Sequence, residues 1–249
     1  MAYSTAHPLR GLTVNIHSPE FVYGMRVDSP ATMTKGERAK LLVQASAYTL
    51  AHDLRKGWRL RRAEAPTGPW AKNIQELRTD GVTVIPGFMS TSEVDALRAK
   101  VFEFVDRFKH TTRLANGTQV IFRDEEQHRG VDTGMIDVFN IDHSVPEVAK
   151  IRDHPSVHEI VRGGFARPTN LKFVTSYINR SVTNPRGYHA DTLATTEFKA
   201  FLVLTDVNDR EDGAHAYIPK THRFSFQKYR NIWRNVMDKG YSISDTNLV

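Results

Sequence analysis

The first hydrophobic pattern along the chain has helical spacing. Apolar and aromatic positions recur at intervals of three and four residues between residues 37 and 54, at Leu41, Ala45, Tyr48 and His52. Thr34 and Glu37 have the Ser/Thr-x-x-Glu spacing of a capping box, which favours a helix start at this point. The pattern predicts a helix over 37–54 that runs into the basic stretch 55–62.

Shorter elements follow a linker at 66–69. Residues 73–80 have a helical pattern that Gly81 terminates, and the β-branched stretch 82–86 predicts a short strand ended by Pro86. Ser90 and Glu93 form a second capping box. The helix that it opens should reach residue 108 with one apolar face, formed by Val94, Leu97, Val101, Phe104, Val105 and Phe108.

The middle of the chain mixes strands and helices. Residues 118–122 and 134–139 are predicted to be strands, and residues 144–161 a pair of helices broken at Pro155. Gly163 and Gly164 are predicted to end the second helix.

The last third has a β pattern. Residues 171–178 and 214–218 are predicted strands. The nearly continuous apolar run 198–205 is typical of a strand buried on both faces. With the helices before it, this pattern predicts an α+β fold.

Composition narrows the class of protein. The 249 residues are 40% hydrophobic, enough for one large domain with an extension. We expect a partly helical N-terminal extension over 1–70 and a domain over 71–249. No apolar run is long enough to cross a bilayer, and no secretory signal is visible, so we expect a cytoplasmic protein without a membrane partner.

Charge and cysteine content narrow the chemistry. The net charge of +6 is a mild excess, and the absence of cysteine leaves His and carboxylate as the metal ligands to consider. The basic stretch 55–62, which contains Trp58, could contact nucleic acid. No nucleic-acid reader motif accompanies it, so a solvated helix end is the better interpretation.

The most informative chemical pattern is the stretch 188–192, Tyr-His-Ala-Asp-Thr. In an extended strand, His189 and Asp191 project from the same face. An imidazole and a carboxylate at this spacing form two thirds of the two-His, one-carboxylate set of non-haem iron(II) oxygenases. Taken alone, the pair is better explained as a surface His beside a loop Asp.

The order of several segments resembles the phytanoyl-CoA dioxygenase family. The segments are 77–90, 188–191, 201–206 and 212–223, so the resemblance covers about residues 74–223. It implies a double-stranded β-helix, the jelly-roll or cupin-like architecture, with N-terminal flanking helices. It also implies iron(II) bound by the His-x-Asp pair and a distal His. 2-Oxoglutarate would be the co-substrate, held by an Arg after the distal His, and a small organic substrate would be hydroxylated.

The chain departs from the family pattern near its C-terminal end. Family members show Pro-Gly-Ser-His-Lys/Arg where this chain has Pro219-Lys-Thr-His222-Arg223, and no His follows Arg223. We therefore expect a jelly roll that is incomplete at its C-terminus. Unprotected strand edges would then favour self-association.

Further candidates each have a structural alternative. His222 is a candidate third iron ligand or a loop His bonded to nearby backbone, and His215 is a packing or surface residue. Lys199 and Phe201 could line the co-substrate pocket, or Phe201 could belong to the core. Arg223 and Arg230 could pair with the anionic co-substrate or be solvated.

Three functions are consistent with these residues. The first is an iron(II)- and 2-oxoglutarate-dependent oxygenase, which as this chain could be inactive. The second is a non-catalytic relative with a binding or structural role. The third is another cupin-type metal enzyme that uses His189, Asp191 and His222 without 2-oxoglutarate.

Overall fold

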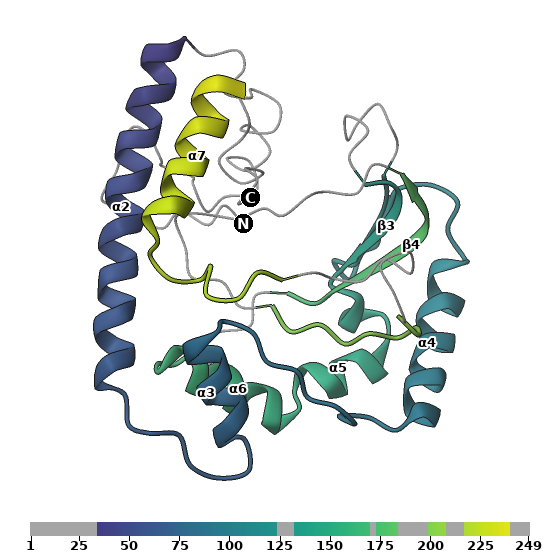
Figure 1. Cartoon of the computed structure of the whole chain (residues 1–249). Coiled ribbons are helices and arrows are strands. Elements are labelled where there is room, and N and C mark those ends of the chain that lie inside the picture. The colour runs from purple at the N-terminus through teal and green to yellow at the C-terminus, as the bar shows by residue number, and fades with distance from the viewer. Residues whose placement is uncertain (1–33, 124–131, 170–172, 184–198, 208–216, 240–249) are drawn as a thin grey trace.

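The computed structural model describes residues 34–123, 132–169, 173–183, 199–207 and 217–239, which form an α+β structure (Figure 1). The first half contains α2 (Lys35–Arg62), α3 (Ala71–Thr79), α4 (Thr91–Val105), β1 (Thr112–Arg113) and β2 (Gln119–Phe122). The second half contains β3 (Thr133–Phe139), the 3-10 helix η2 (Ile141–His143), α5 (Pro146–Arg152), α6 (Pro155–Phe165), β4 (Thr175–Thr183) and α7 (Phe226–Lys239).

The strands form one antiparallel sheet in the order β1-β2-β3-β4. The register places Val120 opposite Val138, and Ile136 opposite Ile178. Since side chains alternate across a strand, these apolar residues share one face of the sheet. The α+β class is confirmed, and the double-stranded β-helix stays a prediction.

Helix α4 covers the apolar face of the sheet. Ser90 caps it as predicted, accepting from the backbone N–H of Glu93, whose carboxylate accepts from the backbone N–H of Ser90 at 2.8 Å. The helix ends at Val105, three residues earlier than expected. The core joins α4 to the sheet and to the segment after it: Leu97, Val101, Phe104, Val105, Val120, Ile136, Val138, Ile141, Val145 and Ile178.

Helices α3 and α6 form a second layer below the sheet (Figure 1). A Cβ on Gly163 would lie 2.6 Å from Cδ1 of Ile74, and one on Gly164 would lie 3.0 Å from Cδ1 of Leu77. The two glycines therefore lie inside α6 and let α3 approach closely. The prediction that they end the helix is wrong, because α6 continues to Phe165.

Helices α2 and α7 lie side by side (Figure 1). The capping box of Thr34 and Glu37 is confirmed. The hydroxyl of Tyr229 on α7 donates to Asp53 on α2 at 3.1 Å, and the indole of Trp233 donates to Ser46 at 2.8 Å. Burial and the neighbouring Asp53 carboxylate raise the pKa of Tyr229 above its usual value.

Helix α2 also exposes apolar side chains. Val43, Leu50, Leu54 and Trp58 are all solvent-accessible. Their spacing of seven, four and four residues places them along one side of the helix. An exposed apolar stripe supports the expectation of self-association, which stays a prediction. None of the helices in the described ranges is long and apolar enough to span a membrane.

Two predicted strands differ from the structure. Residues 82–86 form no strand, and Val84 is 75% exposed. The side-chain amide of Asn73, on α3, donates to the carbonyl of Val84 and to Thr83 Oγ1. The segment is therefore held against α3 by the Asn73 side chain, and it pairs with none of the strands β1–β4 of the described chain.

The apolar run 199–205 is likewise no strand in the described part, and it is not buried on both faces. Leu202 and Leu204 pack against the core, whereas Phe201 and Val203 are 52% and 57% exposed. The segment therefore buries alternate side chains on the core, and the expectation of burial on both faces is wrong.

Candidate functional site

The predicted metal ligands His189 and Asp191 lie outside the described residues, as does His215. The two candidates for the co-substrate pocket are described: Lys199 is exposed and Phe201 is half exposed. Phe201 is thus not a core residue. A role in binding 2-oxoglutarate stays a prediction for both.

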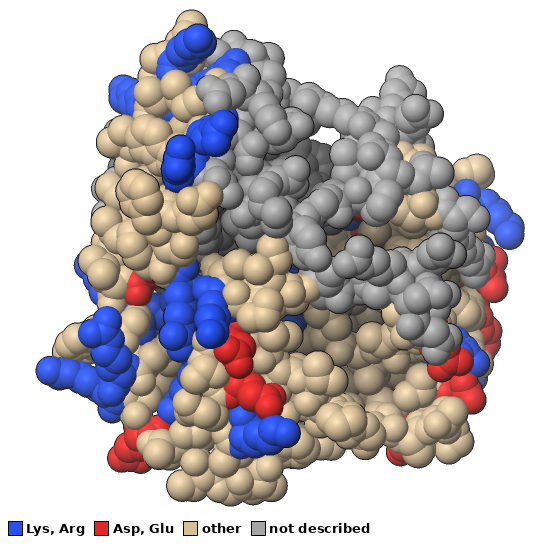
Figure 2. Space-filling model, in the orientation of Figure 1, with Lys and Arg blue, Asp and Glu red and all other residues tan. Residues whose placement is uncertain are grey.

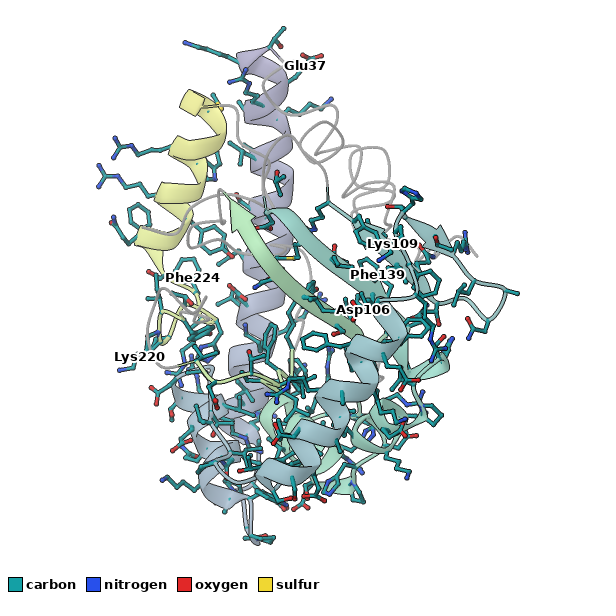
Figure 3. The ribbon with its side chains drawn as sticks, turned by 90° about the vertical axis from the view of Figure 1, so that its right-hand side faces the viewer. Glu37, Asp106, Lys109, Phe139, Lys220 and Phe224 are labelled. Atoms are coloured by element: carbon teal, nitrogen blue, oxygen red, sulfur yellow. The ribbon has the colours of Figure 1, made fainter. Side chains whose placement is uncertain are left out.

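His222 lies on the segment 217–223, which docks on the C-terminal end of α3. The backbone N–H of Lys220 donates to the carbonyl of Asp80 at 2.7 Å. A guanidinium N–H of Arg223 donates to the carbonyl of Arg78 at 2.6 Å, and the ammonium of Lys56 donates to the carbonyl of His222. The segment is therefore held by α2 and α3 together. Figure 3 shows Lys220 and Phe224 on this part of the chain, where it leads into α7.

Gly81 sets the position of the His222 ring. Its φ is +82°, a conformation that residues with a Cβ rarely adopt. A Cβ at Gly81 would lie 2.2 Å from Nδ1 of His222 and 2.6 Å from the hydroxyl of Tyr217. Both ring nitrogens of His222 are buried. The glycine that terminates α3 thus also makes room for the imidazole, and the role of His222 as third ligand stays a prediction.

The two arginines predicted to pair with the co-substrate, Arg223 and Arg230, are both exposed. Arg223 is exposed and bonded to the α3 carbonyl described above. Arg230 is exposed on α7. Pairing of either with an anionic co-substrate stays a prediction.

A buried ionic cluster lies on the sheet. The Nε of Arg123 donates to Oδ2 of Asp137 at 2.8 Å, and its Nη1 donates to Oδ2 of Asp132 at 3.2 Å. The Nη2 of Arg123 also lies 2.8 Å from Oδ2 of Asp137, in an ion pair. The side chains of the three residues are 9%, 3% and 6% exposed, in the order Arg123, Asp137, Asp132. Two buried carboxylates therefore contact the same guanidinium.

The cluster faces away from the α4 core. Asp137 lies between Ile136 and Val138 on β3, and its cross-strand neighbours are Ile121 and Tyr177. Because side chains alternate, these odd-numbered positions share the second face of the sheet. The Oδ1 atom of Asp137 is buried and has no hydrogen-bond partner within the described part of the chain. This oxygen can accept a hydrogen bond from a donor on a bound molecule.

The sequence reasoning missed Arg123 and Asp137. The available signal was an aspartate in the middle of an apolar strand, where Asp is unfavourable. The described ranges contain no group of three His or carboxylate residues able to hold a metal ion.

Comparison of the chain with protein-family models, curated proteins and solved structures finds no match.

Proposed function

We propose that the protein is an iron(II)- and 2-oxoglutarate-dependent oxygenase of the double-stranded β-helix type, which hydroxylates a small organic substrate. The observation that carries the proposal is the His189-x-Asp191 pair. An imidazole and a carboxylate on one face of a strand suit iron(II), which is bound in such oxygenases by two His and one carboxylate. When bound, iron(II) and 2-oxoglutarate supply the oxidising chemistry.

The two faces of the sheet support a site on the side away from α4. One face packs apolar residues against α4, and the other carries the buried Arg123–Asp132–Asp137 cluster. Charged groups are seldom buried unless they are paired or serve a site. Arg123 satisfies the Oδ2 atoms, and Oδ1 of Asp137 is left to receive a donor group of the substrate.

Each remaining residue has a defined role in the proposal. His189 and Asp191 hold the metal, with His222 as the candidate third ligand. Lys199 supplies a cation for a carboxylate of 2-oxoglutarate, and the half-exposed Phe201 offers an apolar wall beside it. The non-polar wall would exclude water from the co-substrate.

Metal binding tests the proposal directly. The purified chain should bind iron(II), or cobalt(II) as a spectroscopic surrogate, and His189→Ala or Asp191→Ala should weaken binding by more than about tenfold. His110→Ala is the matched control, because His110 is exposed and lies two residues before β1, away from the His-x-Asp pair in sequence. Equal metal content in the wild type and all three variants would refute the assignment.

Succinate formation separates the functions. With iron(II), ascorbate and 2-oxoglutarate, succinate production that depends on His189 and Asp191 would support an oxygenase. Metal binding without succinate would favour a metal enzyme that does not use 2-oxoglutarate, and the absence of both would favour the non-catalytic relative. His222→Ala adds a distinction, since a ligand role requires loss of metal affinity. Loss of thermal stability alone would indicate that His222 only packs against Gly81.

A further inference from the structure

A groove lies between α3 and α6, on the layer below the sheet. Its volume is about 770 Å³, within the range of small-molecule sites. Apolar residues form much of its lining: Ile74, Pro155, Gly163, Ala166 and Pro168. The polar lining residues are His158, Glu159, Arg162 and Arg167. The groove can therefore accept an apolar body and presents guanidinium groups beside it.

Arg59 reaches this region from α2. Its Nε donates to the carbonyl of Phe165, the last residue of α6, at 2.9 Å. Its Nη2 is buried and has no hydrogen-bond partner among the described residues. A buried guanidinium nitrogen without an acceptor is costly, so an acceptor supplied by a ligand would stabilise it.

Arg167 brings a second positive charge to the same place. Its guanidinium lies 5.8 Å from the centre of the Phe165 ring. Burial and the positive charge of Arg167 lower the pKa of Arg59 below its usual value. An anion bound between the two guanidinium groups would relieve the repulsion of their like charges.

No carboxylate within the described part of the chain neutralises these arginines. The ion pairs that the structure describes include none made by Arg59, Arg162 or Arg167. Glu159 also lines the groove, and it takes part in none of these ion pairs. Figure 2 shows Lys and Arg side chains over the lower part of α2, the end that approaches α6, and others over its upper part.

We propose that this groove binds the phosphate group of a small phosphorylated molecule. Arg162 and Arg167, which line the groove, hold the phosphate, and Arg59 adds a positive charge from the α2 side. Planar guanidinium groups donate paired N–H bonds to phosphate oxygens, which makes arginine the preferred residue for this recognition. The rest of the ligand packs on Ile74, and the site functions whether or not the protein is an oxygenase.

Titration calorimetry with phenyl phosphate and with inorganic phosphate tests the site. Phenyl phosphate should bind more tightly, because its ring can occupy the apolar part of the groove. Arg167→Gln and Arg162→Gln should each weaken phenyl phosphate binding by about tenfold or more. Arg61→Gln is the control: Arg61 is exposed on the same helix turn as Arg59 and projects from another side of α2.

Thermal unfolding gives a second readout. Without phosphate, Arg167→Gln should be at least as stable as the wild type, since it removes the repulsion with Arg59. With phenyl phosphate, the melting temperature of the wild type should rise and that of Arg167→Gln should not. The melting temperature of Arg167→Gln would thus equal or exceed that of the wild type without phosphate and fall below it with phenyl phosphate. A purely structural role of Arg167 would not produce this change.

Three outcomes would overturn the proposal. The first is an absence of measurable binding by either probe. The second is equal weakening by Arg61→Gln and Arg167→Gln, which would indicate general attraction of anions to a basic surface. The third is binding of a single-stranded oligonucleotide that all three variants weaken alike and that phenyl phosphate does not displace, which would indicate an extended polyanion surface instead.

Discussion

Replacing Gly163 with alanine tests the packing of α3 on α6. A Cβ at this position would lie 2.6, 2.9 and 3.0 Å from Cδ1, Cγ1 and Cγ2 of Ile74. Rotation about the outer bond of Ile74 moves only Cδ1, so Cγ1 and Cγ2 would still be too close. Ile74 is β-branched and 5% exposed, which leaves its side chain little freedom to rearrange. The two helices would have to separate.

The expected magnitude follows from two opposing effects. Alanine is favoured over glycine in a helix interior by about 0.8–1.0 kcal/mol. Overpacking of a close-packed site costs about 1–3 kcal/mol. The net effect of Gly163→Ala should be a decrease of about 1 kcal/mol in the free energy of unfolding. Gly57→Ala is the matched control, since Gly57 lies in α2 with nothing within 4 Å of a Cβ, and it should instead stabilise the protein.

Urea unfolding followed by circular dichroism measures both changes. In an Ile74→Ala background the clash is absent, so Gly163→Ala should become neutral or stabilising there, a signature of direct coupling. If Gly163→Ala stabilises the wild-type protein as much as Gly57→Ala does, the two helices do not approach as closely as described, and the reasoning fails.

Two further predictions concern buried polar groups. Arg123→Met leaves the carboxylate of Asp137 buried without its cation and should lower the free energy of unfolding by about 3–5 kcal/mol in urea titrations; an unchanged midpoint would contradict this. The raised pKa of Tyr229 means that its contribution to stability is complete below the ordinary phenol pKa of about 10 and is lost as pH rises above it. The melting temperature of the wild type should therefore fall more steeply than that of Tyr229→Phe above about pH 10; parallel curves would show that the bond to Asp53 does not hold the phenol neutral.

The helix starts could be predicted because their signals are local. Thr34 with Glu37, and Ser90 with Glu93, meet through hydrogen bonds that span three residues, so the sequence spacing is sufficient to find them. The strands 118–122 and 134–139 and the break at Pro155 were likewise correct to within one or two residues. Helix α7, at Phe226–Lys239, was not predicted from the sequence.

Errors arose where one residue type serves two purposes. Glycine commonly ends a helix, but it also permits two helices to touch, and only the tertiary structure shows that Gly163 does the second. The apolar run 199–205 similarly indicated a doubly buried strand. Hydropathy shows that the side chains are apolar, but it does not show which of them pack against the core. In the structure Leu202 and Leu204 pack on the core and Phe201 is exposed.

The Arg123 cluster shows why a candidate site can be hidden in an ordinary strand pattern. Alternation around Asp137 predicts a polar residue directed to water, yet its side chain is 3% exposed. An apolar residue at this position would avoid the cost of burying a charge, so the cluster does not simply maximise stability. Such local conflicts are expected where binding or chemistry takes place. The buried Oδ1 of Asp137 and the buried Nη2 of Arg59, on two different layers, are therefore the atoms whose partners most directly define what this protein binds.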